Sequence, residues 1–564
     1  MKKILLSLAV LFCLLAPIQV NAITRIINIS ELQGNLTQAL RSQLNGLTYS
    51  DTAYINFDHV GNDTISGTVV AECNVVMSGL GRCKSNIILD NGNDSQNFVA
   101  FWDDTFFAFK GTVNNNISVS ISDLTIRLSE HSGIWWNQAE KYAVKIYHAN
   151  KVDILHVDSY LKNARCTNFD LRVCSNVTVN DCKITNYNNC DHGGNLWIRG
   201  EMHNINVVNN QFYKYGNDEA LAIYDRVINT SGYIRGNASR TNINVIDNDF
   251  YYGYDGEDKN DLFNDMLFSL YTDHLQSDDS CVTKNFKFCN NRIIINDLTH
   301  RSMYISFEPA DNHSNIEIND NYIRNNYSGS TKRYYRNEIE LNDLSHNPDT
   351  IMFKNNIIRN DNPVVTNMGT NGAVFFLLQG GNVCLDGNHF MNTVTADTAA
   401  ISDIGSTIIW CSEKGGKATM RNNTSQNIKL LAQVMSNNQI HYFSLKATNN
   451  YFHGDTRIYC DYSHIDTLDL SFVKNTFISN NMNFFLQEFA SYGNLTFNEN
   501  LVRVNQGFGQ LMTHWSSTPT SSMRFNTLRV RKNFFFGISS IDNLLVNITN
   551  VGSRIVIGNV FITM

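Results

Sequence analysis

Asn204 to Phe212 reads Asn-Ile-Asn-Val-Val-Asn-Asn-Gln-Phe. Two apolar residues alternate at Ile205 and Val207, an asparagine follows at Asn210, and the stretch closes on the apolar Phe212. Alternation with a period of two is typical of a β-strand. The stretch therefore describes a strand, a polar turn residue and the start of another strand.

The same pattern recurs along the rest of the chain at intervals of 25 to 43 residues. Repeats of this length are typical of solenoids, in which one coil cannot bury its apolar face but stacked coils can. Stacked strands lie about 4.8 Å apart, so the repeated asparagine side chains should lie one above another and hydrogen-bond from coil to coil. Chance matches in an asparagine-rich chain are the alternative, but the apolar partners at fixed offsets argue against them. The asparagines predicted to form this ladder are Asn210, Asn248, Asn291, Asn321, Asn356 and Asn388, with further copies up to Asn559.

The composition argues against several functional classes. The formal net charge is −8 and the sequence shows no basic stripe, which argues against a nucleic-acid partner. Proline is scarce, with 5 in 564 residues, and no linker rich in Ser, Gly and Pro interrupts the repeats. Because a solenoid core grows in one dimension, residues 51–564 are predicted to form one long domain.

Residues 1–22 are predicted to be a secretory signal peptide. Lys2 and Lys3 precede an apolar run from Ile4 to Val20, and Val-Asn-Ala follows as the cleavage site. A membrane anchor is the alternative, although the run is slightly short for a membrane span. The mature protein is therefore expected to be secreted, periplasmic or on the cell surface, with no membrane span after cleavage.

Residues 23–50 are predicted to cap the open end of the solenoid. An amphipathic helix is expected at roughly 32–44, laid over the first coil. Short strands are expected next at 52–57 and 64–70, followed by an apolar strand that leads into Gly79-Leu-Gly81.

This order of helix, short strands, Gly-x-Gly turn and asparagine-rich coils resembles the pectin-lyase-like superfamily over about residues 50–564. The resemblance implies an all-β fold, a right-handed single-stranded parallel β-helix with an N-terminal capping helix. It implies a polysaccharide partner, because the superfamily includes pectate lyases, polygalacturonases, alginate lyases and epimerases, and phage tailspikes. Since a fold does not imply a chemistry, two classes of function stay open. One is a polysaccharide lyase or glycoside hydrolase, and the other is a non-catalytic β-helix for glycan binding, adhesion or a structural spike.

The resemblance also identifies the first strand of each coil, whose outer face carries the substrate cleft in enzymes of the superfamily. If the aliphatic and phenylalanine residues of these strands point inward, aromatic rings remain outside that can stack on sugar faces. These rings are Trp197, Tyr224, Tyr271 and Tyr304. The carboxylates Glu308 and Glu340 would lie one coil apart on the same face, where they could act as a general acid and its ionised partner. Solvated surface charges are the alternative for both glutamates.

Two further patterns bear on catalysis. Gly216-Asn217-Asp218 resembles the Gly-Asp-Asp turn of polygalacturonase-like enzymes, with Asn217 in place of the first aspartate. An ordinary turn chosen for its backbone geometry is the alternative for Asp218. A lyase would instead need a cation to neutralise a uronate and a base to remove the α-proton. Arg199 is a candidate for the cation, and Tyr224, Tyr271 or His192 for the base.

No cofactor is required by these patterns, and no metal-binding residue is assigned. The oxygen-rich loop Asp255–Asp261 could hold calcium, but its spacing does not match a regular calcium loop, and a solvated acidic loop is the alternative. Cys166 and Cys190 are expected one coil apart in equivalent turns, so they could form a disulfide in an exported protein. Buried thiols are the alternative.

Overall fold

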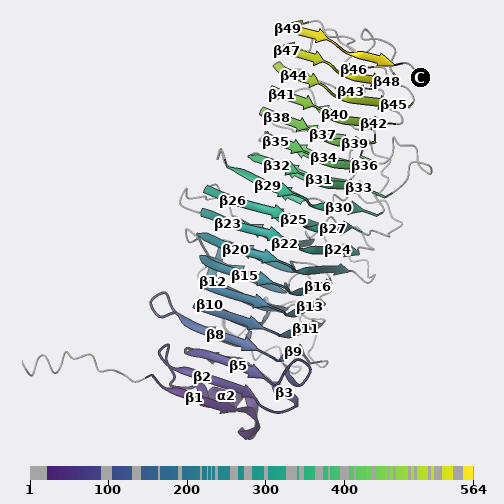
Figure 1. The fold of residues 1–564 in the computed structure, drawn as a ribbon. Coiled ribbons are helices and arrows are strands. Elements are labelled where there is room, and N and C mark those ends of the chain that lie inside the picture. Colours follow the sequence, from purple (N-terminus) through teal and green to yellow (C-terminus); the bar gives the residue numbers. More distant parts are fainter. Residues whose placement is uncertain are drawn as a thin grey trace, which may run out of the picture.

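The computed structural model confirms the fold class. It describes residues 22–90, 105–129, 141–162, 166–187, 193–215, 219–224, 226–229, 232–235, 239–253, 265–271, 282–296, 303–310, 312–325, 339–341, 349–361, 373–378, 381–393, 406–411, 415–428, 430–434, 440–454, 457–460, 465–479, 484–487, 492–505, 510–513, 524–537 and 550–562. Within these ranges the chain winds as a right-handed parallel β-helix, with its coils stacked from the amino-terminal to the carboxy-terminal end (Figure 1).

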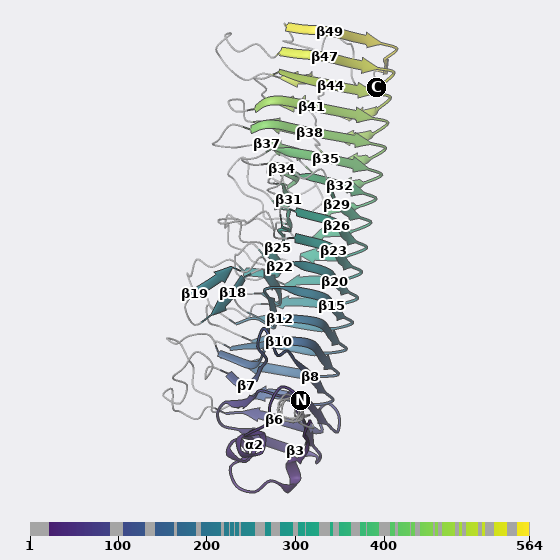
Figure 2. The same ribbon diagram turned by 90° about the vertical axis from the view of Figure 1, so that its left-hand side faces the viewer.

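Most of the described coils contribute three strands in a fixed order. One coil consists of β14 (Leu196–Arg199), β15 (Met202–Val208) and β16 (Gln211–Tyr215). Each of these strands pairs in parallel with the equivalent strand of the next coil, β17 (Leu221–Tyr224), β20 (Arg240–Ile246) or β21 (Asp249–Gly253). Strands of one kind therefore stack along the axis, as the view turned by 90° shows (Figure 2).

First and second strands share one 31-stranded sheet, and third strands form a separate stack. The first strands are β4 (Val69–Ala71), β7 (Thr105–Lys110), β14, β17, β22 (Asp265–Tyr271), β25 (Met303–Phe307), β28 (Ile339–Leu341), β31 (Ala373–Leu378), β34 (Ser406–Cys411), β37 (Leu430–Val434), β40 (Arg457–Cys460), β43 (Phe484–Gln487) and β46 (Gln510–Thr513). β10 (Lys141–Leu155) and β12 (Cys166–Asn180) each supply a first and a second strand without a break. The other second strands are β1 (Thr24–Asn28), β2 (Thr52–Phe57), β5 (Asn74–Gly79), β8 (Ile117–Ser122), β15, β20, β23 (Val282–Cys289), β26 (Asn312–Asn319), β29 (Thr350–Lys354), β32 (Asn382–Asp386), β35 (Gly416–Arg421), β38 (Ile440–Thr448), β41 (Ile465–Val473), β44 (Tyr492–Asn498), β47 (Arg524–Arg531) and β49 (Asn550–Ile557). The third strands are β3 (Gly61–Ile65), β6 (Ser85–Leu89), β9 (Thr125–Leu128), β11 (Asp158–Lys162), β13 (Lys183–Tyr187), β16, β21, β24 (Arg292–Asn296), β27 (Tyr322–Asn325), β30 (Ile357–Asn360), β33 (His389–Asn392), β36 (Thr424–Gln426), β39 (Tyr451–His453), β42 (Thr476–Ser479), β45 (Leu501–Val504), β48 (Phe534–Phe536) and β50 (Val560–Ile562).

The asparagine ladder lies in the tight turn between the second and third strands. Asn210 Nδ2 donates to Asn248 Oδ1 at 3.0 Å and to the Val179 carbonyl at 2.9 Å. Asn248 Nδ2 donates in the same way to Asn291 Oδ1 at 3.1 Å. The bonds continue from coil to coil through Asn321, Asn356, Asn388, Asn423, Asn450, Asn475, Asn500 and Asn533 to Asn559. The members from Asn210 to Asn533 are buried, so each side chain satisfies backbone groups that the turn leaves unpaired.

A second asparagine stack, absent from the sequence prediction, lies on the outside of the second strands. Asn242 Nδ2 donates to Asn204 Oδ1 at 2.9 Å, and Asn285 Nδ2 donates to Asn242 Oδ1 at 2.9 Å. Asn204 has a φ of 59° and Asn242 a φ of 58°. Asparagine is one of the few residues that readily adopt this left-handed conformation. Some asparagines of this chain therefore lie where the backbone turns sharply.

Apolar side chains from all three strands fill the interior. Ile205, Val207 and Phe212 are fully buried. The Phe212 ring stacks on Phe250 of the next coil, with 4.9 Å between ring centroids and 9° between planes. The alternation quoted from the sequence therefore places its apolar residues in one continuous core.

The amino-terminal helix is shorter than predicted. α2 (Leu36–Leu44) begins after Asn35, whose side chain accepts a hydrogen bond from the Gln38 N–H at 3.1 Å. This cap satisfies a free donor of the first helical turn and ends the preceding extended segment. Leu40 and Leu44 are buried, and the helix packs against β3 and β4 at the end of the solenoid. The strand expected at 64–70 is divided between β3 and β4.

No helix within the ranges given above is long and apolar enough to cross a membrane. Residues 1–21, which hold most of the predicted signal peptide, lie outside those ranges. Cleavage and export stay predictions.

Asn321→Ala should lower the free energy of unfolding by about 1–3 kcal/mol. The substitution removes the acceptor for the Asn291 side chain and the donor to the Phe288 carbonyl, both inside the turn. Asn312→Ala is the matched control, because Asn312 is an exposed asparagine of the same coil, and it should change stability by no more than about 0.5 kcal/mol. Unfolding in denaturant measures both variants. Equal midpoints for Asn321→Ala and the unchanged protein would contradict a stabilising ladder.

Candidate functional site on the first strands

The outer face of the first strands carries two columns of side chains in register. Strand alternation sends Leu196 and Ile198 into the core and leaves Trp197 and Arg199 on the other face. The first column contains Lys145, Asp170, Trp197, Ala222, Ser269 and Ser306. The second column contains Lys110, Tyr147, Arg172, Arg199, Tyr224 and Tyr271.

Glu308 extends the second column by one coil. Its backbone N–H donates to the Leu270 carbonyl at 2.7 Å, which places it beside Tyr271. The Ser306 hydroxyl donates to Glu308 Oε1 at 3.2 Å. The carboxylate is buried, and the serine fixes its orientation.

The structure places the predicted first-strand residues on successive strands. Trp197 and Arg199 lie on β14, Tyr224 on β17 and Tyr271 on β22, and these strands pair in that order. The backbones of Tyr304 and Glu340 lie on β25 and β28, in register with Met266 and Ser306. The side chains of Tyr304 and Glu340 are not among the described ones, and neither are residues Asp218, His192 and Cys190 or the loop 255–261.

The face around Trp197 is closed, which corrects the expectation of an open cleft there. Trp197 is 3% exposed and Arg199 is 5% exposed. The Arg199 guanidinium lies 4.0 Å from the centroid of the Trp197 ring, and the Tyr142 and Trp197 rings meet edge to face with 6.4 Å between centroids. An enclosed tryptophan packs against the protein and cannot offer a free ring face to a sugar. Tyr224 and Tyr271 are half-buried, so the accessible rings lie farther along the column.

Asp170 and Arg172 occupy this face, and the sequence analysis did not identify either of them. Asp170 is fully buried, and Arg172 Nε donates to its Oδ2 at 2.6 Å. Arg199 Nε lies 3.2 Å from Asp170 Oδ1. Arg172 Nη2 donates to the Tyr142 hydroxyl at 3.2 Å, and Lys145 Nζ lies 4.7 Å from the centroid of the Tyr142 ring. One carboxylate therefore lies among three cations.

The cations set the charge of Asp170. Burial alone raises the pKa of this carboxyl, but the positive charges of Arg172, Arg199 and Lys145, with the hydrogen bond from Arg172, outweigh burial. The pKa is lowered below its ordinary value, so Asp170 is ionised at neutral pH. A carboxylate held in this way stabilises the arginines and is a poor proton acceptor.

Tyr224, Tyr271 and Glu308 form the part of the second column that can do chemistry on a ligand. The Tyr224 and Tyr271 rings meet edge to face, with 5.8 Å between centroids. The Tyr224 hydroxyl donates to Glu219 Oε1, and Glu219 is buried. Two aromatic rings beside an oriented carboxylate can bind a sugar face and exchange a proton with it.

No cluster of three or more His, Cys, Asp or Glu side chains within the described ranges is placed to hold a metal ion. The loop 255–261 lies outside those ranges, so calcium binding stays a prediction. The same holds for the disulfide, because Cys166 is buried in β12 while Cys190 lies outside them.

The chain is similar to several solved structures at low sequence identity. No protein-family model and no curated protein sequence matches the chain. DFA-IIIase from Arthrobacter chlorophenolicus A6 is 12% identical over 71% of this chain and 84% of its own, with a TM-score of 0.37. A family 28 exopolygalacturonase from Yersinia enterocolitica is 9% identical over 90% of this chain and 78% of its own, with a TM-score of 0.32. The Agl-KA catalytic domain is 10% identical over 92% of this chain and 68% of its own, also with a TM-score of 0.32. These values are too low to carry an argument about activity.

Proposed function

We propose that the chain is an exported carbohydrate-active protein, a polysaccharide lyase or glycoside hydrolase that works on the outer face of its first strands. The observation that supports this most is the run of Tyr224, Tyr271 and Glu308 on adjacent strands of one column. Strands lie about 4.8 Å apart, so the three positions span about 10 Å, the length of roughly two sugar units.

In the hydrolase form of the proposal, Glu308 is the general acid or base. Ser306 holds its carboxylate, and burial of the site excludes part of the competing water. Hydrolysis requires a second carboxylate. Glu340 is proposed for that role because its strand follows in register, and Asp218 is the other candidate. Tyr224, Tyr271 and Tyr304 are proposed to bind the sugar rings.

In the lyase form of the proposal, Tyr224 is the base. Its hydroxyl donates to Glu219, so in this form the oxygen takes the α-proton as it passes its own proton to Glu219, which leaves Tyr224 neutral and Glu219 protonated. Arg199, the register partner of Tyr224, supplies positive charge near the uronate. Asp170 holds that guanidinium through an ion pair, and the Trp197 ring holds it through a cation–π contact.

A non-catalytic glycan-binding β-helix is the second candidate, and one observation favours it. Asp170 is neutralised by arginines, and Glu219 accepts the Tyr224 hydroxyl, so two of the carboxylates on this face serve the structure. A face with an oriented carboxylate and two aromatic rings can hold a glycan without cleaving it.

A screen of the secreted protein against uronate polymers and neutral glycans tests the proposal. Unsaturated ends indicate a lyase, and new reducing ends indicate a hydrolase. Binding without either product supports the second candidate. If the protein neither binds nor cleaves any member, the proposal fails. Sequencing the amino terminus of the same material tests export, because cleavage after Ala22 leaves Ile23 as the first residue.

A further inference from the structure

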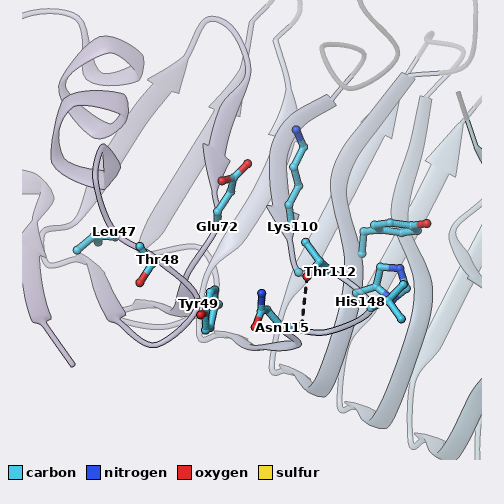
Figure 3. Close-up of a pocket in the computed structure, with 11 residues that line it drawn as sticks. Leu47, Thr48, Tyr49, Glu72, Lys110, Thr112, Asn115 and His148 are labelled. Atoms are coloured by element: carbon cyan, nitrogen blue, oxygen red, sulfur yellow. Dashed lines mark hydrogen bonds between the residues drawn. The ribbon is translucent and has the colours of Figure 1, made fainter. Parts of the chain in front are cut away.

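A pocket of about 530 Å³ lies at the amino-terminal end of the second column, where Lys110 and Tyr147 line it. Figure 3 shows its lining residues. Its size falls within the range of about 300–1,000 Å³ that is typical of small-molecule sites. Its lining comes from three places, the turn 47–49 with Glu72, the loop 110–115, and Tyr147 with His148.

The pocket belongs to the same face of the solenoid as the proposed site. Lys110 on β7 is in register with Tyr147 on β10, and Tyr147 is in register with Arg172 on β12. The column continues through Arg199 to Tyr224 on β17. Three strand steps separate Tyr147 from Tyr224, or about 14 Å. The enclosed side chains of Arg172 and Arg199 lie between the two places.

Backbone contacts fix the floor of the pocket and one of its walls. The Gly111 N–H donates to the Tyr147 carbonyl at 2.7 Å, and a Cβ on Gly111 would lie 2.0 Å from the His148 carbonyl oxygen. Only glycine permits this approach. Thr112 and Asn115 exchange two backbone hydrogen bonds of 3.0 Å, which close the loop that forms the wall.

The opposite wall is the turn that carries Tyr49. Asp51 Oδ2 accepts from the Thr48 N–H at 2.7 Å, and Asp51 Oδ1 accepts from the Ile23 N–H at 2.6 Å. Asn74 Nδ2 donates to the Tyr49 carbonyl at 3.1 Å. The Tyr49 side chain is 51% exposed. Three hydrogen bonds therefore hold the turn that carries the Tyr49 ring. The apolar ring and the hydroxyl group of Tyr49 can contact a ligand that stays partly solvated.

The lining suits an uncharged ligand rich in hydroxyl groups. Tyr49 and Tyr147 supply ring faces, and Figure 3 shows Glu72 and Lys110 extending to the same side of the pocket. These two charges have opposite signs. Burial lowers the pKa of His148, so its imidazole is neutral at pH 7 and adds no third charge. A uronate would need an excess of cations, which lies instead in the cluster around Asp170.

We propose that this pocket binds neutral sugar units, one against Tyr49 and one against Tyr147, hydrogen-bonded by Glu72, Lys110 and Asn115. The glycan class rests on the proposed function, and the neutral unit follows from the balanced charge of the lining.

Calorimetric titration with a neutral oligosaccharide from the glycan screen tests the pocket. Tyr49→Ala and Tyr147→Ala should each weaken binding by about 5- to 10-fold through loss of a stacking partner. Tyr54→Ala is the matched control, because Tyr54 is a 39% exposed tyrosine of β2 on the second strands, and its affinity should not change. Tyr49 lies on a turn and is exposed, so Tyr49→Ala is expected to fold. It therefore tests the pocket even if Tyr147→Ala, a change within β10, does not fold. Unchanged affinity in Tyr49→Ala would overturn the proposal.

Photo-crosslinking with oligosaccharides that carry a reactive end separates the pocket from the proposed function. Label on peptides that contain Tyr49 or Tyr147, from neutral sugars, supports the pocket even if the protein cleaves nothing. Label confined to peptides that contain Tyr224 or Glu308 overturns the pocket and leaves the proposed function standing. Label on the pocket from uronates alone, or no label on the pocket from any neutral sugar, also overturns it.

Discussion

Asp170→Asn should lower the free energy of unfolding by about 3–5 kcal/mol, because it leaves buried cations without their counter-charge. Arg172 and Arg199 both approach the Asp170 carboxylate, and all three side chains are at most 5% exposed. Asp153→Asn is the control, since Asp153 pairs with Lys151 at 2.9 Å on the surface and should cost no more than about 1 kcal/mol. Denaturant unfolding of the three proteins measures the difference.

The pH dependence of that difference gives a second test of the same cluster. Because the folded pKa of Asp170 is lowered, its stabilising contribution is complete above the ordinary carboxyl value of 3.8 and is lost as pH falls through the folded pKa. The gap in stability between the unchanged protein and Asp170→Asn should therefore be constant from neutral pH to about pH 5 and narrow only below about pH 4. A gap that closes between pH 7 and pH 5 would show that Asp170 is not held ionised by the arginines.

Glu308→Gln should reduce turnover by about 10²- to 10⁴-fold, the usual effect of removing a general acid or base. Substrate binding should stay within about threefold, because glutamine keeps the shape of the side chain and can still interact with Ser306. Glu317→Gln is the control, since Glu317 is a half-buried glutamate on the second strands. Steady-state rates on the active glycan measure the effect.

Full activity in Glu308→Gln would remove Glu308 from the mechanism. The unchanged protein could instead bind glycan without turnover. In that case, a change in affinity in Glu308→Gln but not in Glu317→Gln would show that the glycan binds at this face.

The sequence predicts the solenoid well because its repeat is local and redundant. Ile205, Val207 and Asn210 fix one turn, and many copies at equivalent offsets fix the stack. The outer asparagine stack at Asn204 and Asn242 was missed, because a corner that requires a left-handed φ leaves no periodic signal other than asparagine itself.

The candidate site was predicted less well because burial on the outer face depends on neighbouring coils. Phe169-Asp-Leu-Arg172 alternates as Leu196-Trp-Ile-Arg199 does, and this similarity could have identified Asp170 and Arg172 as outward residues. Alternation distinguishes the two faces of a strand, but it cannot show that Asp170 draws Arg199 into an enclosed cluster. The pocket at Tyr49 and Tyr147 joins residues almost a hundred positions apart and has no local pattern.

A crystal structure of Glu308→Gln with the oligosaccharide selected by the screen would show whether the glycan lies on the first strands. We expect sugar rings against Tyr224 and Tyr271, with the side chain at position 308 within hydrogen-bonding reach, about 2.6–3.2 Å, of the bond to be cleaved or of a bound hydroxyl. A glycan bound on the second or third strands, with no contact to these tyrosines, would contradict it.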